Sequence, residues 1–272
     1  MKNIISLEDI RATITEYGED PKKFMKDINE QINQYYLNKW REKKSGTLLR
    51  MMENENIESK YLKQMWQKLN IRKEPWVAVI QMQDNAFITG PRKAKIYNDS
   101  QKGICPYCKV PATIPHILHT CIVNKKSQLE KHDYICTEIY NYILDMYNLK
   151  EEWYELNNPP NIIYNKKSQI LVYYNAIVLK QNYAREFANK PDICMIDKKN
   201  KILLIIDATI VKDDQGNTAY HQKITKYNDL MCKLKRQYQS KTYDIIPVVI
   251  SSNGLIHVKT TELLKIQNQN QL

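Results

Sequence analysis

Glycine is scarce in this sequence, with only six glycines among 272 residues. The chain has no glycine-rich loop that could cradle phosphates and no Walker or dinucleotide fingerprint, which argues against a nucleotide-binding domain. No apolar run approaches the ~18 residues that span a membrane. The N-terminal segment carries acidic residues where a signal peptide has its apolar core. These absences predict a protein that is not secreted and has no membrane partner.

Positive charge is in excess. The sequence contains 41 Lys and Arg against 30 Asp and Glu, which gives a formal net charge of +11. Such an excess favours a polyanionic partner such as nucleic acid. The alternative is a charged surface that serves solubility, combined with a coding bias toward Lys, Asn, Ile and Tyr. With 43% hydrophobic and 26% charged residues, the composition is that of a folded globular protein.

The order of the predicted elements indicates a mixed α/β, or α+β, fold in four regions. Residues 1–98 are predicted to be a helical basic region, and residues 99–126 a small CCHC zinc knuckle. Residues 127–160 would form a helix and a linker that ends at Asn157–Pro160. Residues 161–272 would form the core, a small mixed sheet flanked by helices.

Hydrophobic spacing predicts the individual elements. Residues 1–70 are expected to be helical, and residues 71–98 irregular because Pro75 and Pro91 break regular structure. Pro247 cannot donate to a strand ladder, which places its strand at a sheet edge. The remaining predicted helices are 127–154, 168–187, 218–238 and 260–266, and the predicted strands are 191–197, 202–211 and 243–251.

Four metal-ligating residues follow one another closely, in the pattern C-x2-C-x7-H-x4-C: Cys105, Cys108, His116 and Cys121. The two-residue gap lets both thiolates face one cation from a tight turn, and the later His and Cys complete a tetrahedron around zinc. The segment is too short to bury a core of its own, so the metal would supply its folding energy. His119 is an alternative to His116 as the third ligand.

A disulfide with incidental histidines is the other interpretation of this segment. It fits poorly, because a reducing compartment is implied and the other cysteines, Cys136, Cys194 and Cys232, are isolated in the sequence. A closed four-ligand zinc site leaves no open position for chemistry. We therefore expect structural zinc that braces the protein and does not catalyse.

Two aspartates fall at opposed positions of a predicted hairpin. A turn at Lys199–Asn200 places Asp192 across from Asp207, with Cβ atoms roughly 4.5–5.5 Å apart on one face. Carboxylates that close repel each other unless a proton or a divalent cation lies between them. Mg²⁺, or Mn²⁺ in its place, would let the pair bind a scissile phosphate and activate water. Alternatively, Asp192 is a turn residue and Asp207 a salt-bridged structural acid.

The same stretch resembles a known nuclease family. Pro191-Asp192, a spacer of 14 residues and Asp207 resemble the PD-(D/E)xK core shared by type II restriction enzymes and Holliday-junction resolvases. With the upstream knuckle, which contains His116-Ile117-Leu118, the pattern closely resembles the C-terminal restriction-like endonuclease of early-branching LINE (non-LTR) retrotransposons, including the amoebal elements. The blocks 207–211 and 219–227 are also similar to that family, and the resemblance covers about residues 100–250.

The resemblance implies a restriction-endonuclease-like core and a divalent-metal-dependent DNA endonuclease, a nickase whose cut strand primes reverse transcription. It implies double-stranded DNA as a partner, with element RNA and a reverse transcriptase region of the same polyprotein as further partners. The site of action would be the nucleus. The chain lacks a Tyr/Phe-x-Asp-Asp polymerase signature, so we expect the nuclease portion of a larger polyprotein or a stand-alone remnant.

One position departs from the simple family pattern. Thr209 stands where a Lys would follow the second acid by two residues. In the LINE enzymes, by resemblance, the Lys comes from the following helix, which points to Lys223; it could orient the water or offset charge on the phosphate. Lys226, one turn along the helix, is the alternative, and Lys212 a weaker one. Arg185 is a further candidate on the preceding predicted helix, where a salt bridge to a structural acid is the other interpretation.

Two other functions are compatible with the sequence. One is a non-catalytic, zinc-dependent nucleic-acid-binding module on a degenerate nuclease scaffold. The other is a Holliday-junction-resolvase-like nuclease, which needs a symmetric dimer and branched substrates. Basic stretches that would contact phosphates in each case, and that also fit ordinary exposed faces, are Lys39–Arg50, Arg92–Lys95 and Lys233–Arg236.

Overall fold

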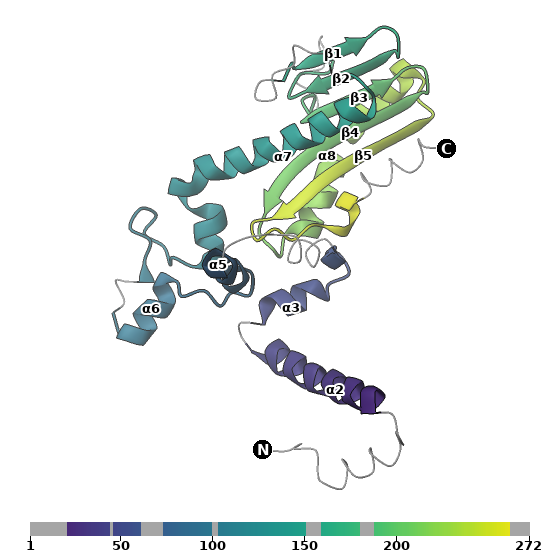
Figure 1. Cartoon of the computed structure of the whole chain (residues 1–272). Coiled ribbons are helices and arrows are strands. Elements are labelled where there is room, and N and C mark those ends of the chain that lie inside the picture. Colours follow the sequence, from purple (N-terminus) through teal and green to yellow (C-terminus); the bar gives the residue numbers. More distant parts are fainter. Residues whose placement is uncertain are drawn as a thin grey trace.

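Helices and one five-stranded mixed sheet make up an α+β fold in the computed structural model (Figure 1). The structure describes residues 21–43, 46–60, 73–99, 103–150, 159–179 and 188–261. In these ranges, no helix is long and apolar enough to cross a membrane.

The sheet lies in the C-terminal half and follows chain order, β1-β2-β3-β4-β5. Its strands are β1 (Ile162–Asn165), β2 (Ile170–Tyr174), β3 (Ile193–Asp197), β4 (Ile202–Val211) and β5 (Thr242–Ser251). β1 to β4 pair with one another in antiparallel fashion, whereas β5 runs parallel to β4 after the crossover helix α8 (Gly216–Tyr238). Pro247 lies in β5, and β5 is an edge strand as predicted.

One long helix covers each face of the sheet. α7 (Lys125–Met146) and α8 lie on opposite sides in Figure 1. Alternate residues of β3 face them: Ile193 and Met195 pack in the cluster beneath α7, and Cys194 and Ile196 in the cluster beneath α8. Because both faces are covered, β3 is buried along its whole length. α7 thus shares the core of the sheet.

The hairpin of β3 and β4 has the predicted register. Ile193 pairs with Ile206, and Asp197 with Ile202. Asp192 and Asp207 therefore occupy the next position along each strand, just beyond the last pair of the ladder. The prediction that these two acids come together at one end of the hairpin is correct at the level of the backbone.

The turn of this hairpin is longer than predicted. Four residues, Lys198–Lys201, separate the paired Asp197 and Ile202, instead of a two-residue turn at Lys199–Asn200. The carboxylate of Asp197 accepts hydrogen bonds from the backbone N–H of Asn200 at 2.8 Å and from its Nδ2 at 2.7 Å. Lys201, and not Asn200, adopts the left-handed conformation, with φ 57°. The predicted and the observed turn are centred on the same two residues, so the register of the hairpin is the predicted one.

The predicted helix 168–187 is wrong over its described first part. Residues Ile170–Tyr174 form β2, in which Val172 pairs with Met195 of β3. The β-branched and aromatic side chains of this segment suit a half-buried strand, and β3 needs a partner on this side. The first part of the predicted helix that carries Arg185 is therefore a strand, and Arg185 itself lies outside the described residues.

The irregular region predicted for residues 71–98 is also wrong. It contains α5 (Lys73–Gln83) and α6 (Gly90–Tyr97). Pro75 and Pro91 lie in the first turn of these helices. A backbone N–H at such a position has no intrahelical acceptor, so a proline there costs no hydrogen bond. The prolines therefore mark helix starts and not breaks.

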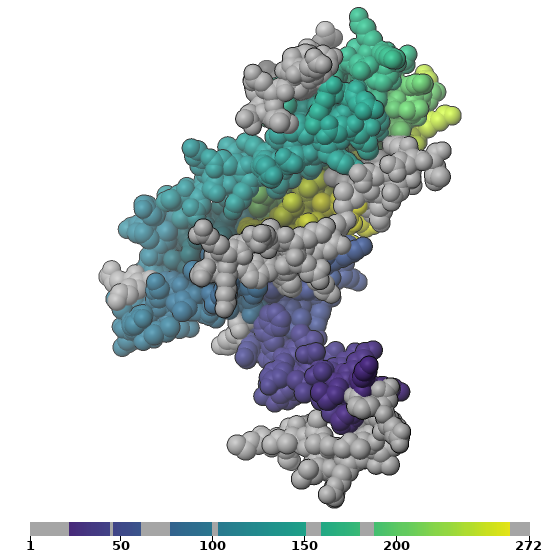
Figure 2. All heavy atoms as spheres, in the orientation of Figure 1, coloured from purple at the N-terminus to yellow at the C-terminus, as the bar shows by residue number. Residues whose placement is uncertain are grey.

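The N-terminal helices α2 (Pro21–Glu42) and α3 (Thr47–Met52) agree with the helical prediction. α2 projects away from the sheet in both views (Figures 1 and 2). Asp84 joins these helices to α5, because its carboxylate accepts hydrogen bonds from Trp40 Nε1 at 2.8 Å and from the backbone N–H of Leu48 at 3.3 Å. Gln83 Nε2 then donates to the carbonyl of Asn253, which follows β5.

Candidate metal centre and carboxylate site

The first two cysteines of the predicted knuckle lie in a tight turn. An isolated bridge between Ile104 and Pro111 closes this loop. The backbone N–H of Cys105 donates to Val110 at 2.8 Å, and the N–H of Lys109 donates back to Cys105 at 3.0 Å. Lys109 adopts the left-handed conformation, with φ 58°. The thiols of Cys105 and Cys108 therefore turn toward the same point, as the two-residue gap predicts.

The turn η2 (His116–Thr120) brings in the other two ligands. The ligand atoms of Cys105, Cys108, His116 and Cys121 all lie within 4.8 Å of one another. The sulfur of Cys121 is 3.9 Å from that of Cys105 and 3.9 Å from that of Cys108. Thiolates bound to one tetrahedral zinc at about 2.3 Å lie about 3.8 Å apart. These four residues, which we call the knuckle cluster, could therefore hold a metal ion such as zinc.

His116, and not His119, belongs to the knuckle cluster. His116 Nε2 is buried and has no hydrogen-bond partner, a costly state for a polar atom that a metal would relieve. Its Nδ1 lies 3.1 Å from Thr120 Oγ1, the second contact that commonly orients a metal-binding histidine. His119 Nδ1 instead contacts Ser252 Oγ at 3.1 Å.

Thiol chemistry also favours metal over disulfide. All six cysteines of the chain are free. A hydrogen bond from the backbone of Cys108, together with the contact to His116, lowers the pKa of Cys105 to about 6. Metal ligands are thiolates, so a cysteine that loses its proton easily suits this position.

The knuckle cluster is connected to α7. Gln128, in the first turn of α7, donates from Nε2 to the carbonyl of His119 at 2.6 Å, and Asn124 Nδ2 donates to the carbonyl of Ile117 at 2.7 Å. A metal that fixes η2 would therefore also fix the start of α7. This connection agrees with a structural role.

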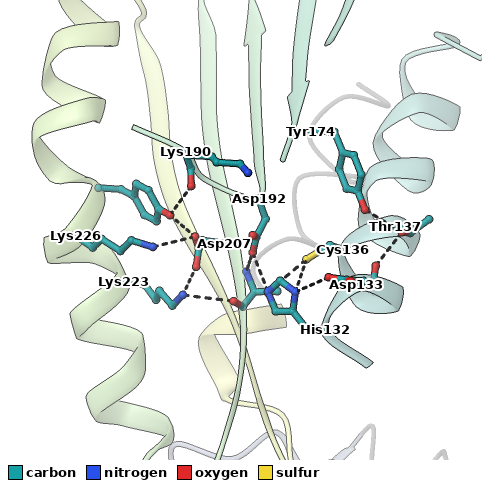
Figure 3. A network of polar contacts seen from close by, with 12 residues as sticks. His132, Asp133, Cys136, Thr137, Tyr174, Lys190, Asp192, Asp207, Lys223 and Lys226 are labelled. Atoms are coloured by element: carbon teal, nitrogen blue, oxygen red, sulfur yellow. Dashed lines mark hydrogen bonds and ion pairs between the residues drawn. The ribbon is translucent and has the colours of Figure 1, made fainter. Parts of the chain in front are cut away.

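Asp207 is the centre of the carboxylate site. Its side chain is almost fully buried, and Figure 3 shows it directed toward α8. Oδ2 forms an ion pair with Lys223, while Oδ1 accepts a hydrogen bond from the hydroxyl of Tyr227 and lies 3.6 Å from Lys226 Nζ. Both lysines named from the sequence thus meet Asp207. The hydroxyl of Tyr227 is a further member of the site that the sequence did not predict.

Asp192 lies beside Asp207 but is turned the other way. Its Oδ2 accepts a hydrogen bond from the backbone N–H of Ala208 at 2.7 Å, and His132 Nε2 of α7 lies 3.4 Å from the same oxygen. Figure 3 shows the side chain directed toward α7. The expectation of two carboxylates turned toward each other is therefore wrong in direction. Asp192 precedes β3 in a bend, so the ladder does not fix its side chain to one face.

These contacts shift three pKa values. Burial opposes ionisation of Asp192, but the hydrogen bonds from His132 and from the N–H of Ala208 outweigh it, so the pKa of Asp192 is below its ordinary value. The bond to Asp192 raises the pKa of His132 well above its usual range. Burial and the hydrogen bond to Asp207 raise the pKa of Tyr227, which keeps it a neutral donor.

Sequence reasoning missed His132 and Cys136. Cys136 is isolated from the other cysteines in the sequence but lies beside His132 in the structure. A signal was present, because His132-x3-Cys136 puts both side chains on one face of a helix, one turn apart. Lys212, the weaker alternative to Lys223, lies beyond β4 in a separate pocket lined also by His119 and Asp213.

Comparison with models of known protein families gave no match, and comparison with curated proteins gave none either.

We predict that the chain binds zinc in the knuckle cluster and that Cys108→Ser contains one equivalent less than the native chain, because it loses a ligand of a closed site. The measurement is metal content by mass spectrometry after purification without added zinc. Cys232→Ser, which changes an exposed cysteine on α8, is the matched control and keeps the native content. Equal zinc in Cys108→Ser and the native chain would contradict the assignment.

Proposed function

We propose that this protein is a divalent-metal-dependent DNA endonuclease that nicks duplex DNA. The observation that carries the proposal is the surrounding of Asp207: a buried carboxylate with two lysines and a tyrosine hydroxyl on it, next to a second carboxylate, Asp192. This combination unites the oxygen ligands and the positive charge that phosphodiester cleavage requires.

The carboxylates suit Mg²⁺, or Mn²⁺ in its place, since these hard cations take oxygen ligands and commonly use only one or two carboxylates. Such an ion, when bound, holds the scissile phosphate and makes water more acidic. The hydrogen bond from the N–H of Ala208 and the contact with His132 both involve Oδ2 of Asp192, so Oδ1 would be the oxygen that takes the cation. Asp207 would exchange its ion pair with Lys223 for the cation.

Lys223 and Lys226 supply the charge that a phosphate needs. Two ammonium groups approach Asp207, and together they balance the charges of Asp207 and Asp192. A purely structural acid would be satisfied by one of them. With a cation held by Asp207, the nearer group, on Lys223, would be free to contact the phosphate or to orient water. Tyr227 would continue to hold Oδ1 of Asp207.

The family resemblance supplies the biological setting of the proposal. The nuclease would be that of a LINE retrotransposon, its nick priming reverse transcription in the nucleus. Its partners would be double-stranded DNA, element RNA and the reverse transcriptase region of the same polyprotein. The net charge of +11 supports a nucleic-acid partner of either kind.

A zinc-dependent binding module without catalysis is the second candidate. One observation favours it, namely that Asp207 is neutralised by Lys223 and Tyr227 within the protein itself. In that case, the buried acid would only hold α8 on the sheet.

A nicking assay separates the two candidates. We expect the native chain to relax supercoiled plasmid in the presence of Mg²⁺. Asp207→Asn should lower the nicking rate more than about 100-fold, because removing a metal ligand costs at least as much activity as removing a residue that only orients a ligand. Asp229→Asn, at an exposed position of the same helix α8, is the matched control and keeps the native rate. Nicking by Asp207→Asn at the native rate, or none by the native chain, would contradict the proposal. A four-way junction cut in preference to linear duplex would instead favour the resolvase alternative.

The two lysines are distinguished by a paired substitution. Lys223→Ala should reduce nicking by roughly 100-fold, in the range seen when a group that stabilises the transition state is removed. Lys226→Ala should reduce it less than about 10-fold, because its ammonium lies 3.6 Å from Asp207 and its side chain is 45% exposed. The measurement is the single-turnover rate at saturating protein. The reverse order would assign the role to Lys226.

A further inference from the structure

Three potential metal ligands converge between α7 and the start of β3. His132 and Cys136 lie one turn apart on α7, and Asp192 approaches them from the sheet (Figure 3). One ligand atom from each of the three lies within 4.8 Å of the other two. We call these residues the α7 triad. No residue of the knuckle cluster belongs to it, and Lys223, Lys226 and Tyr227 lie on the other side, around Asp207.

The spacing of His132 and Asp192 matches a single metal ion, and Cys136 lies close to both. His132 Nε2 is 3.4 Å from Asp192 Oδ2, and Cys136 Sγ is 3.8 Å from His132 Nε2. Around a tetrahedral zinc, bond lengths of about 2.0–2.3 Å put nitrogen and oxygen ligands about 3.4 Å apart, and nitrogen and sulfur ligands about 3.6 Å apart. Cys136 Sγ is also 3.9 Å from His132 Nδ1, so the imidazole and the thiol would both have to turn to place Nε2 and Sγ on one ion.

Each ligand is already held in place. His132 Nδ1 lies 3.2 Å from Asp133 Oδ1, which is the carboxylate–histidine pairing that directs the other ring nitrogen toward a metal. Asp192 is fixed by the N–H of Ala208 at 2.7 Å. Cys136 is buried in the core cluster that joins α7 to the sheet. The triad is therefore preorganised by groups that belong to the fold.

A simple ion pair between His132 and Asp192 explains only part of this geometry. It does not account for Cys136, whose sulfur lies against the polar imidazole and not solely among apolar side chains. Imidazole and thiolate together select zinc and similar transition metals, whereas Mg²⁺ prefers oxygen. The donor set of the triad is therefore different in kind from the pair of carboxylates.

We propose that His132, Cys136 and Asp192 bind a thiophilic divalent transition-metal ion, with Zn²⁺ as the best match. Three protein ligands leave a fourth coordination position for water or another ligand, in contrast to the closed knuckle cluster. The imidazole of His132 is 30% exposed, which gives the ion access from solvent. The inference does not need the nuclease to be correct. If Asp192 also serves the nuclease, Zn²⁺ in the triad competes with Mg²⁺ for that carboxylate.

The test is the zinc stoichiometry of the full chain, measured by native mass spectrometry after loading with zinc chloride and removal of the excess. The native chain is expected to hold two equivalents, and His132→Gln and Cys136→Ser one each. Cys232→Ser keeps two, since its thiol is exposed on α8. With Co²⁺ as the probe, Cys136→Ser should lose the thiolate absorption of the second equivalent and keep that of the first.

One equivalent in the loaded native chain, or two in His132→Gln, would overturn the proposal. If Cys136→Ser does not fold, which far-ultraviolet circular dichroism reports, His132→Gln decides, because its side chain is only partly buried. Asp207→Asn separates this inference from the proposed function, since it removes nicking and is expected to keep both zinc equivalents. The two proposals can therefore fail separately. A native chain that binds two zinc equivalents but does not nick contradicts only the nuclease, and one that nicks but binds a single equivalent contradicts only the triad.

Discussion

The buried carboxylate of Asp207 is the constraint on which the site depends. An ionised carboxylate in the interior costs several kcal/mol unless charge and hydrogen bonds compensate it. Lys223 and Tyr227 provide that compensation from α8, and the ring of Tyr227 is itself fully buried between helix and sheet. The same side chains of α8 therefore hold the helix on the sheet and compensate the charge of Asp207. A cation that displaces Lys223 would keep the carboxylate compensated and leave α8 in place.

α7 connects the knuckle cluster with the α7 triad. Its first turn is hydrogen-bonded to the loop of the knuckle cluster through Gln128, and its middle carries His132 and Cys136. Zinc in the knuckle cluster would thus fix the helix that presents His132 and Cys136 to Asp192. As proposed, the closed cluster would have a structural role, whereas metal ions in the triad and in the carboxylate site would keep coordination positions for other molecules.

The sequence was sufficient where local chemistry decides the structure. The spacing of Cys105 to Cys121 predicted the knuckle cluster, and the two apolar strands with their turn predicted the β3–β4 register. Long-range partners decided the rest. Ile170–Tyr174 became a strand because β3 required a neighbour, and Asp192 turned to α7 because His132, 60 positions away in the sequence, lies there. Periodicity along one segment carries no information about such partners.

The most direct test of the central claim is the location of a divalent ion in crystals soaked with Mn²⁺, found by anomalous scattering. The account predicts a manganese peak within bonding distance of Asp207 and Asp192, with the Lys223 ammonium moved off the carboxylate of Asp207. The contradicting result is a lysine still paired with Asp207 and no manganese beside either aspartate, which would leave Asp207 as a structural acid.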